Sequence, residues 1–165
     1  MATRTTQLRH GDARDIAGVE AIMEAAFEPR FGEAWTRNQC LGVIAMPGVR
    51  LTLALTDDTP AGFALVRSVA GEAELLLLAV APAARRRGVG TALLRAVIAD
   101  AVAGGVSDLH LEVRSGNAAL RLYAEHGFRK VGERRGYYRG KAGEAFDAHT
   151  YRLPLPDPDT EPHAS

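Results

Sequence analysis

The residues best suited to chemistry in this chain are three arginines and two glycines that follow an apolar run near its middle. The run starts at Leu75 and stops at Pro82, and Arg85-Arg86-Arg87-Gly88-Val89-Gly90-Thr91 then opens a helical pattern. This order predicts a buried strand, a cationic turn and a helix whose first amides are free. Free amides and arginines at a helix N-terminus bind anions, phosphate above all. Glycine lets a ligand approach the backbone, so we expect a phosphorylated ligand here.

Two common phosphate-binding motifs do not fit this segment. A P-loop has lysine and then serine or threonine after its last glycine, whereas Gly90 is followed by Thr91 and Ala92. A dinucleotide-binding turn needs a third glycine where Leu93 stands, and it follows its strand directly, whereas residues 82–87 intervene. What remains is Arg-x-x-Gly-x-Gly at the start of a helix. By itself this string is also compatible with solvated arginines and a flexible turn.

The elements that must position this segment are those of one α/β domain. The periodicity of apolar residues predicts strands and helices in alternating groups, and the strand 74–80, apolar on both faces, belongs at the centre of the sheet. Thr36 could cap the second helix. The expected strands are 6–9, 49–56, 61–69, 74–80, 108–114, 130–134 and 145–153, and the expected helices are 16–27, 36–46, 88–103 and 117–126.

Length and composition bound the class of protein. A chain of 165 residues with 47% apolar residues can bury roughly 70% of its unfolded surface in one domain. Cys40 is the only cysteine, and no cysteine, histidine and carboxylate spacing suggests a metal site. No apolar segment resembles a signal peptide or a membrane span. We expect a soluble, intracellular domain over residues 1–153, with 154–165 as a disordered tail.

Three separated blocks of the sequence resemble the GNAT superfamily of N-acetyltransferases. The first is the arginine and glycine segment, which is similar to the acetyl-CoA signature; the second runs from Leu111 to Tyr123 and on to Gly127-Phe128. The string Arg134-Arg135-Gly136-Tyr137-Tyr138, and Trp35-Thr36 in an early loop, are similar to bacterial ribosomal-protein-alanine N-acetyltransferases. The resemblance implies a single-domain fold with a mixed, mostly antiparallel sheet that is splayed at its centre and flanked by about four helices.

The resemblance also implies a set of residues that bind acetyl-CoA. The backbone of Leu78, Ala79 and Val80 would pair with the pantetheine arm as an added strand does, and Asn117 would contact the cofactor. Asn117 precedes Tyr123 by six residues, whereas relatives usually have seven, so its contact is the least secure of these. The residues that would wrap the pyrophosphate are Arg85, Arg86, Arg87, Gly88, Val89, Gly90 and Thr91.

Acetyl transfer to an amine needs a proton acceptor and a stabilised thiolate. By the resemblance, Glu112 is the base, directly or through a water, and Tyr123 is the acid that serves the coenzyme A sulfur in a direct, ternary-complex mechanism. The structural alternatives are a solvated carboxylate paired with Arg114 or Arg135, and an aromatic ring that only packs. His110 is interpreted as structural, and Cys40 is not expected to carry an acyl group.

The acceptor would enter opposite coenzyme A, between the early loop and the loop of the last strands. Trp35, Tyr137 and Tyr138 are the candidate substrate contacts, and Phe31, Glu33 and Asp147 lie in the same segments. We expect a peptide or protein N-terminus, in particular a ribosomal protein that begins with alanine, in the cytoplasm, with no nucleic acid or membrane partner and with a monomer or homodimer as the active form. A small-molecule amine or a lysine side chain remains an alternative acceptor.

Two further classes of protein stay open. A noncatalytic acyl-CoA sensor would keep the arginine and glycine segment without turnover. An RNA-associated module would use the basic residues Arg85–Arg87, Arg134, Arg135 and Arg139. The formal net charge of zero argues against the RNA module, because general polyanion binding depends on an excess of positive charge.

Overall fold

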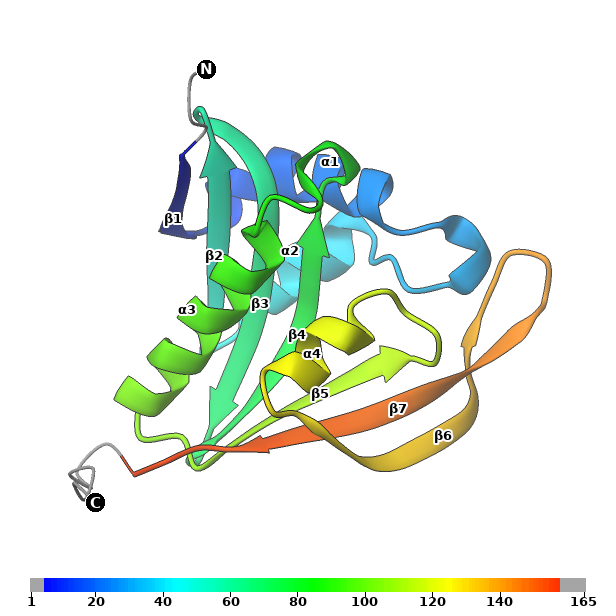
Figure 1. Cartoon of the computed structure of the whole chain (residues 1–165). Helices are drawn as coiled ribbons and strands as arrows, with labels where there is room; N and C mark the ends of the chain where they lie inside the picture. Colours follow the sequence, from blue (N-terminus) through cyan, green and yellow to red (C-terminus); the bar gives the residue numbers. More distant parts are fainter. Residues whose placement is uncertain (1–4, 158–165) are drawn as a thin grey trace.

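A single seven-stranded sheet in the order β1-β2-β3-β4-β5-β7-β6 runs through the molecule (Figure 1). It is seen in a computed structural model that describes residues 5–157. The strands are β1 (Thr6–Gly11), β2 (Val49–Thr56), β3 (Thr59–Val69), β4 (Glu72–Val80), β5 (Asp108–Arg114), β6 (Arg129–Arg139) and β7 (Ala145–Pro154). The α-helices are α1 (Ile16–Ala26), α2 (Arg37–Ile44), α3 (Val89–Ala103) and α4 (Leu120–Glu125), with short 3-10 turns η1 (Ala13–Asp15), η2 (Pro29–Phe31) and η3 (Pro82–Ala84).

All neighbouring strands are antiparallel except β4 and β5. These two run parallel and pair over only four positions, from Glu72 opposite Asp108 to Leu75 opposite Leu111. Beyond Leu75 the two strands diverge, as Figure 1 shows. The mixed, mostly antiparallel sheet with a splayed centre is therefore confirmed.

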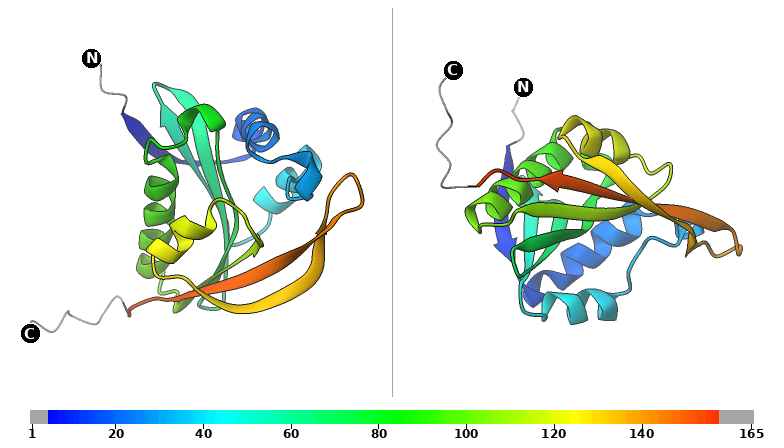
Figure 2. Two further views of the ribbon diagram at one scale, coloured as in Figure 1. Left: turned by 45° about the vertical axis from the view of Figure 1, so that its right-hand side comes forward. Right: turned by 90° about the horizontal axis from the view of Figure 1, so that it is seen from below.

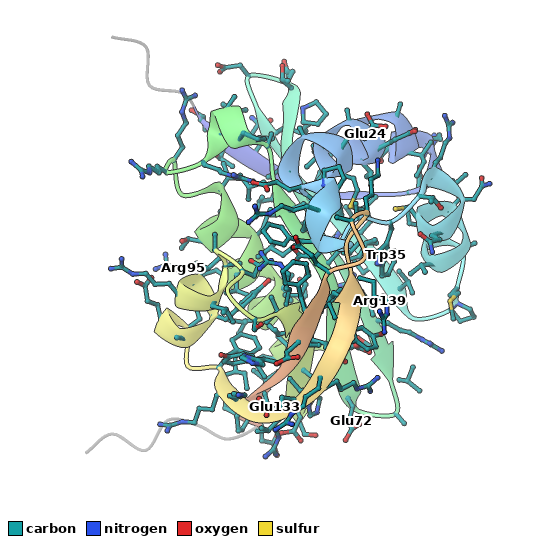
Figure 3. The ribbon with its side chains drawn as sticks, turned by 90° about the vertical axis from the view of Figure 1, so that its right-hand side faces the viewer. Glu24, Trp35, Glu72, Arg95, Glu133 and Arg139 are labelled. Atoms are coloured by element: carbon teal, nitrogen blue, oxygen red, sulfur yellow. The ribbon has the colours of Figure 1, made fainter. Side chains whose placement is uncertain are left out.

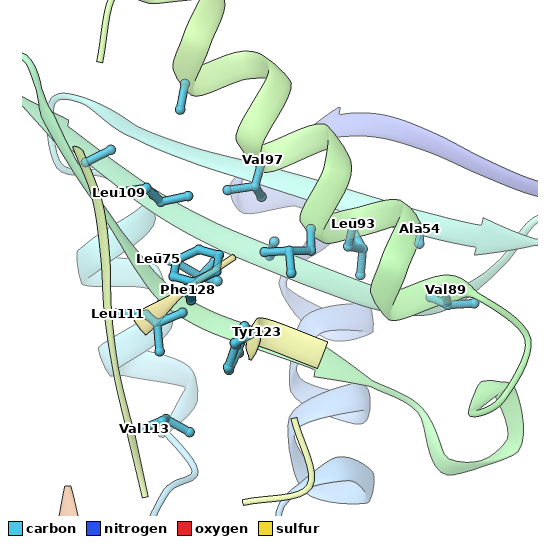
Figure 4. Close-up of a cluster of buried hydrophobic side chains, with 14 of the residues drawn as sticks. Ala54, Leu75, Val89, Leu93, Val97, Leu109, Leu111, Val113, Tyr123 and Phe128 are labelled. Carbon is cyan, nitrogen blue, oxygen red and sulfur yellow. The ribbon is translucent and has the colours of Figure 1, made fainter. Parts of the chain in front are cut away.

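Helices cover both faces of the sheet. Helix α3 packs on one face, where Leu93, Leu94 and Val97 meet Leu75 and Leu109 (Figure 4). Helices α1 and α2 lie on the other face (Figure 2), where Val19 and Met23 pack with a separate buried cluster. Each large side chain buried in this way stabilises the fold by roughly 1.5–3 kcal/mol relative to an exposed position.

A β-bulge in β4 changes which face its side chains reach. Leu65 of β3 lies opposite Leu77, whereas Val66 lies opposite Leu75, so Leu76 is the extra residue. Leu75 packs with the α3 cluster, and Leu77, two positions later, packs with the α1 cluster. An inserted residue reverses the alternation of a strand, which explains why this apolar run shows no simple period.

The expected elements agree well with the structure and differ mainly at their ends. The strands 49–56 and 108–114 and the Thr36 cap are confirmed, the last as a capping box with Gln39. Strand β3 starts earlier than expected because Asp57 and Asp58 adopt positive φ and make a tight turn. Helix α1 stops at Ala26, and Pro29 begins η2 instead of ending the helix.

The end of the chain is hydrogen-bonded somewhat beyond the expected domain boundary. Strand β7 includes Pro154, and the Leu155 N–H donates to the Ser107 carbonyl. Residues 158–165 of the expected tail lie outside the described residues. Within residues 5–157, no helix is both long and apolar enough to cross a membrane.

Candidate active site

Two cavities meet beside the open end of the splayed sheet. The larger has a volume of about 540 Å³ and the smaller about 180 Å³. Both are bordered by the same five residues: Phe27, Glu33, Leu78, Asn117 and Ala119. Two ligands bound in these cavities would therefore meet at a common wall.

The larger cavity is formed by the end of β4 and the start of α3. Because β4 and β5 pair no further than Leu75 and Leu111, the backbone of residues 76–80 has no strand partner on its β5 side. Leu78, Ala79 and Val80 border the cavity along this free edge. The structure thus brings the three expected backbone contacts to a place where a ligand amide could pair with them.

The turn into α3 presents backbone amides to the same cavity. Arg86 and Gly88 have φ of 63° and 76°, and Ala92 is the first residue whose N–H reaches back to the helix, to the Gly88 carbonyl at 2.9 Å. The amides of residues 89–91 are left without a partner in the helix. Gly88, Val89, Gly90 and Thr91 all border the cavity, which gives an anion at this end a set of N–H donors.

The two glycines of this turn have different physical roles. Gly88 needs its positive φ, and a Cβ there would meet no atom within 4 Å. Gly90 has ordinary helical geometry, but a Cβ there would lie 3.3 Å from Leu122 Cδ2 and 3.6 Å from Val80 Cγ2. Leu122 and Val80 also border the cavity, so any larger side chain at position 90 would fill its floor.

The three arginines of the turn are not equivalent. Arg85 and Arg86 border the larger cavity, whereas Arg87 does not. A guanidinium nitrogen of Arg85 donates to the Ala26 carbonyl at 3.0 Å, which ties the turn to the last residue of α1. The sequence does not distinguish the three side chains, because nothing in the string Arg-Arg-Arg indicates which of them faces the cavity.

All five expected catalytic and acceptor residues border the smaller cavity. Its wall includes Glu112 from β5, Tyr123 from α4, Trp35 from the loop before α2, and Tyr137 and Tyr138 from β6. Figure 3 looks onto the side of the molecule that carries Trp35 and the end of β6 at Arg139. The five residues are far apart in the sequence, and the fold collects them at one place.

A second bulge explains how two adjacent tyrosines reach the same cavity. Between Arg134 and Tyr138 the pairing of β6 with β7 advances four residues on β6 but only two on β7. Gly136 has a φ of 63°, and its N–H donates to Asp147 Oδ1 at 2.9 Å. Neighbouring side chains of a regular strand point to opposite faces, so the bulge is what places Tyr137 and Tyr138 together. Asp147 supports the bulge and does not border the cavity.

Glu112 carries an oxygen that is available for chemistry. Its Oε1 is buried and accepts no hydrogen bond from any described residue. The nearest cation, Arg134 Nε, lies 3.7 Å away on a side chain that is 62% exposed. A carboxylate oxygen that is buried without a partner is costly to keep, and this oxygen is free to accept a hydrogen bond from a ligand in the cavity.

Tyr123 is buried beside the smaller cavity. Its ring packs edge-to-face on Phe128 with centroids 5.8 Å apart, and no residue within 5–157 hydrogen-bonds its hydroxyl. Burial raises the pKa of Tyr123 well above its ordinary value, and the charge of Glu33 and the neighbouring Tyr138 raise it further. The hydroxyl therefore keeps its proton at neutral pH. Burial likewise raises the pKa of Tyr138, with Glu112 as the next cause.

Glu33 and Arg114 form a buried ion pair that sequence reasoning did not find. Arg114 Nε donates to Glu33 Oε1 at 2.8 Å, and the two side chains are 10% and 9% exposed. Asn117 Nδ2 donates to the other oxygen, Oε2, at 2.7 Å. The one signal in the sequence is a charged residue at position 114, in a strand where polar and apolar residues otherwise alternate. Nothing in the sequence indicates that its partner lies 81 positions earlier.

Other candidates fall outside the cavities. His110 borders neither of them. Cys40 is buried in α2, and burial raises the pKa of its thiol, so it is a poor nucleophile. Among residues 5–157 no group of three or more histidine, cysteine or carboxylate side chains could hold a metal ion.

The mostly antiparallel sheet with its splayed centre is the fold of a GNAT acetyltransferase. The model of the acetyltransferase (GNAT) family matches residues 16–128, and the chain belongs to this family. It is an N-acetyltransferase, as its curated relatives are named.

Several similar relatives are bacterial. An N-alpha-acetyltransferase RimI of Mycobacterium tuberculosis is 36% identical over 156 residues, which cover 92% of each chain. A ribosomal protein bS18-alanine N-acetyltransferase of Salmonella typhimurium is 43% identical over 107 residues, 64% of this chain and 72% of that one. The crystal structure of the ribosomal-protein-S18-alanine N-acetyltransferase of Escherichia coli is similar with a TM-score of 0.82 and 29% identity, covering 92% of this chain and 94% of that one.

Proposed function

We propose that this chain moves an acetyl group from acetyl-CoA to the N-terminal α-amine of a protein, by direct attack in a ternary complex. The observation that carries the proposal is the common wall of the two cavities. Glu112 and Tyr123 border the smaller cavity, and the free edge of β4 and the first turn of α3 border the larger one. A donor and an acceptor can therefore be held at the same time, with proton-transfer groups beside the point of contact.

The residues of the larger cavity fit acetyl-CoA. The amides of residues 89–91 and the side chains of Arg85 and Arg86 would hold the pyrophosphate. The free edge at Leu78–Val80 would hold the pantetheine arm by backbone hydrogen bonds. When bound, the cofactor supplies a thioester as the activated acetyl donor.

Glu112 and Tyr123 would handle the protons of the reaction. The free Oε1 of Glu112 would accept a proton from the incoming ammonium, directly or through one water. The Tyr123 hydroxyl, whose pKa is raised by burial, would keep its proton until it donates toward the leaving sulfur. A well-placed acid or base typically contributes about 10²–10⁴-fold to the rate. Cys40 lies outside both cavities, so no acyl-enzyme step is needed.

An α-amine suits this site better than a lysine side chain. With a pKa of about 8, roughly a tenth of an α-amine is neutral at pH 7, whereas a lysine at about 10.4 is neutral only to a few parts in ten thousand. The named activities of the relatives support a ribosomal protein that begins with alanine as the acceptor. Trp35, Tyr137 and Tyr138 would frame its first residues. We place the reaction in the cytoplasm, where ribosomal proteins are made.

The test is mass spectrometry of synthetic peptides incubated with the protein and acetyl-CoA. An alanine-initiated ribosomal peptide should gain one acetyl group at its α-amine. The same peptide with a blocked N-terminus and an internal lysine should gain none. Acetylation of the lysine alone would exclude α-amine transfer, and transfer only to small amines would exclude a protein acceptor.

A further inference from the structure

Glu33 connects segments that belong to different parts of the site. One oxygen accepts a hydrogen bond from Arg114 at the end of β5, and the other accepts one from Asn117 in the turn before α4. Glu33 itself lies in the loop between η2 and α2. Glu33 and Asn117 border both cavities, and Arg114 borders the larger. This network therefore stands at the junction of the two cavities.

Each partner of Glu33 is fixed by further contacts. Arg114 Nη1 donates to the Ser115 carbonyl at 2.9 Å, and its guanidinium lies 3.6 Å from the centroid of the Phe31 ring. Asn117 Oδ1 accepts from the Ala119 N–H at 2.8 Å. The Asn117 amide thus has one orientation that satisfies both ends, with its oxygen on Ala119 and its nitrogen on Glu33.

Two of the carboxylates that border the smaller cavity, Glu33 and Glu112, differ in availability. Both oxygens of Glu33 are occupied and its charge is balanced by Arg114. Oε1 of Glu112 has no hydrogen bond from a described residue. Of these two, Glu33 is suited to hold other groups in place, and Glu112 is suited to accept a proton.

We propose that Glu33 is a positioning residue that locks the loop between α1 and α2 onto the turn 115–119, and so sets where the two cavities meet. The loop carries Trp35, and the turn leads into α4, which carries Tyr123. Loss of the lock lets acceptor and acid move independently. The inference rests on the proposed function, because it assumes that donor and acceptor occupy these cavities.

The hydrogen-bond pattern allows an exchange test. In Glu33→Gln the new amide nitrogen faces Asn117 Nδ2, donor against donor. In Asn117→Asp two carboxylates face each other, although the Ala119 N–H keeps its acceptor. The double variant E33Q/N117D restores one donor opposite one acceptor and keeps the negative charge within the network. A double-mutant cycle of this kind isolates the pairwise interaction.

We expect both single variants to lower kcat/KM for the acceptor peptide by roughly 10- to 100-fold, since ångström displacements cost about that much. The double variant should return to within about threefold of the wild type, which is far from additive. Affinity for coenzyme A, measured by calorimetry, should change by less than about threefold in Glu33→Gln, because the amides of α3 would supply the charge-assisted contacts to the pyrophosphate. Urea midpoints should fall in the single variants and recover in the double variant.

The control is Glu125→Gln, which removes the same charge from an exposed pair with Arg121 on α4; it should behave as the wild type. A wild-type kcat/KM in Glu33→Gln, or a double variant whose loss equals the product of the single losses, would overturn the proposal. If a single variant does not fold, recovery of folding in the double variant supports the lock and failure to recover overturns it. A wild-type protein without α-amine transfer would count against the proposed function, and the urea cycle would still report on the lock.

Discussion

Arg134 Nε lies 3.7 Å from Oε1 of Glu112, a buried oxygen that receives no hydrogen bond from the described residues. Arg134 is 62% exposed, so the pair is long and screened by solvent. The contact leaves the oxygen open to an amine that approaches through the smaller cavity. Glu112 thereby differs from Glu33, both of whose oxygens accept hydrogen bonds.

Glu112→Gln should therefore remove the proton acceptor while preserving the shape of the cavity. We expect kcat to fall by about 10²–10⁴-fold, the usual contribution of a general base. Coenzyme A affinity by calorimetry should be unchanged, because Glu112 does not border the larger cavity. Arg134→Gln is the matched control and should change the rate by no more than about fivefold, since exposed pairs are worth up to about 1 kcal/mol. Equal losses in the two variants would reduce Glu112 to an electrostatic role.

Tyr123→Phe tests the proposed acid. The ring keeps its contact with Phe128 and no hydrogen bond to a described residue is lost, so the thermal midpoint should stay close to that of the wild type. Turnover should fall by about 10²-fold or more, as for loss of a general acid. A wild-type rate would show that Tyr123 only packs.

The pKa of Tyr123 gives a second readout on the same residue. An unperturbed tyrosine loses its proton near pH 10, but burial raises the pKa of Tyr123 above that value. Since the protonated form persists to higher pH, turnover should not decline between about pH 9 and 10 through loss of this proton. A pH–rate profile of single turnover checks this. A decline in the wild type over this pH range that is absent in Tyr123→Phe would contradict the prediction.

Gly90→Val should block binding of acetyl-CoA. A Cβ at position 90 already approaches Leu122 and Val80, and the branches of valine would extend over the cavity floor. Calorimetry should show a large loss of coenzyme A affinity while circular dichroism stays unchanged. Gly42→Val is the control, because Gly42 also lies in a helix but a Cβ there meets no atom within 4 Å. Normal affinity in Gly90→Val would place the cofactor elsewhere.

Gly140→Ala tests the close contact between the end of β6 and η2, which we expect to shape the smaller cavity. A Cβ on Gly140 would overlap the Arg30 carbonyl, and one on Gly32 would overlap the Arg139 carbonyl, so backbones meet directly here. Alanine at 140 must push the end of β6 away from η2, at a cost of roughly 1–3 kcal/mol. We expect a lower thermal midpoint and a higher KM for the peptide. Gly132→Ala is the control, since its nearest neighbour would lie 3.9 Å away, and an equal effect in both variants would contradict the idea.

Much of the fold could be predicted because the periodicity of apolar residues agrees with the capping and turn residues at the ends of the elements. The strand 108–114 alternates cleanly, and Thr36 is followed by Gln39 in a capping box. The bulges at Leu76 and near Gly136 could not be predicted, because a bulge depends on the pairing with the neighbouring strand. In addition, a run of leucines has no alternation of polar and apolar residues that a bulge could interrupt. The Glu33–Arg114 pair was missed for a related reason, since it joins distant segments that only the folded chain brings together.

Most of the site residues predicted from the sequence border one of the two cavities. Residues 85–91 could be recognised as a candidate anion site because free amides, arginines and glycines act locally at a helix start. Which arginine faces the cavity depends on two backbone torsions, at Arg86 and Gly88, that the string does not specify. Asn117 lies in a turn and α4 begins at Leu120, three residues after the expected helix start, and the contact of Asn117 with the cofactor stays a prediction.

The four pairs between β4 and β5 hold the two halves of the sheet together at one end only. At the other end the facing edges of β4 and β5 are not paired with each other, and a bound ligand with amide groups could hydrogen-bond to them. Amide protons on both of these edges should then exchange with solvent quickly in the free protein and slowly once the ligand is bound. Under the proposed function, a bound pantetheine arm would act as an additional strand at this edge of the sheet.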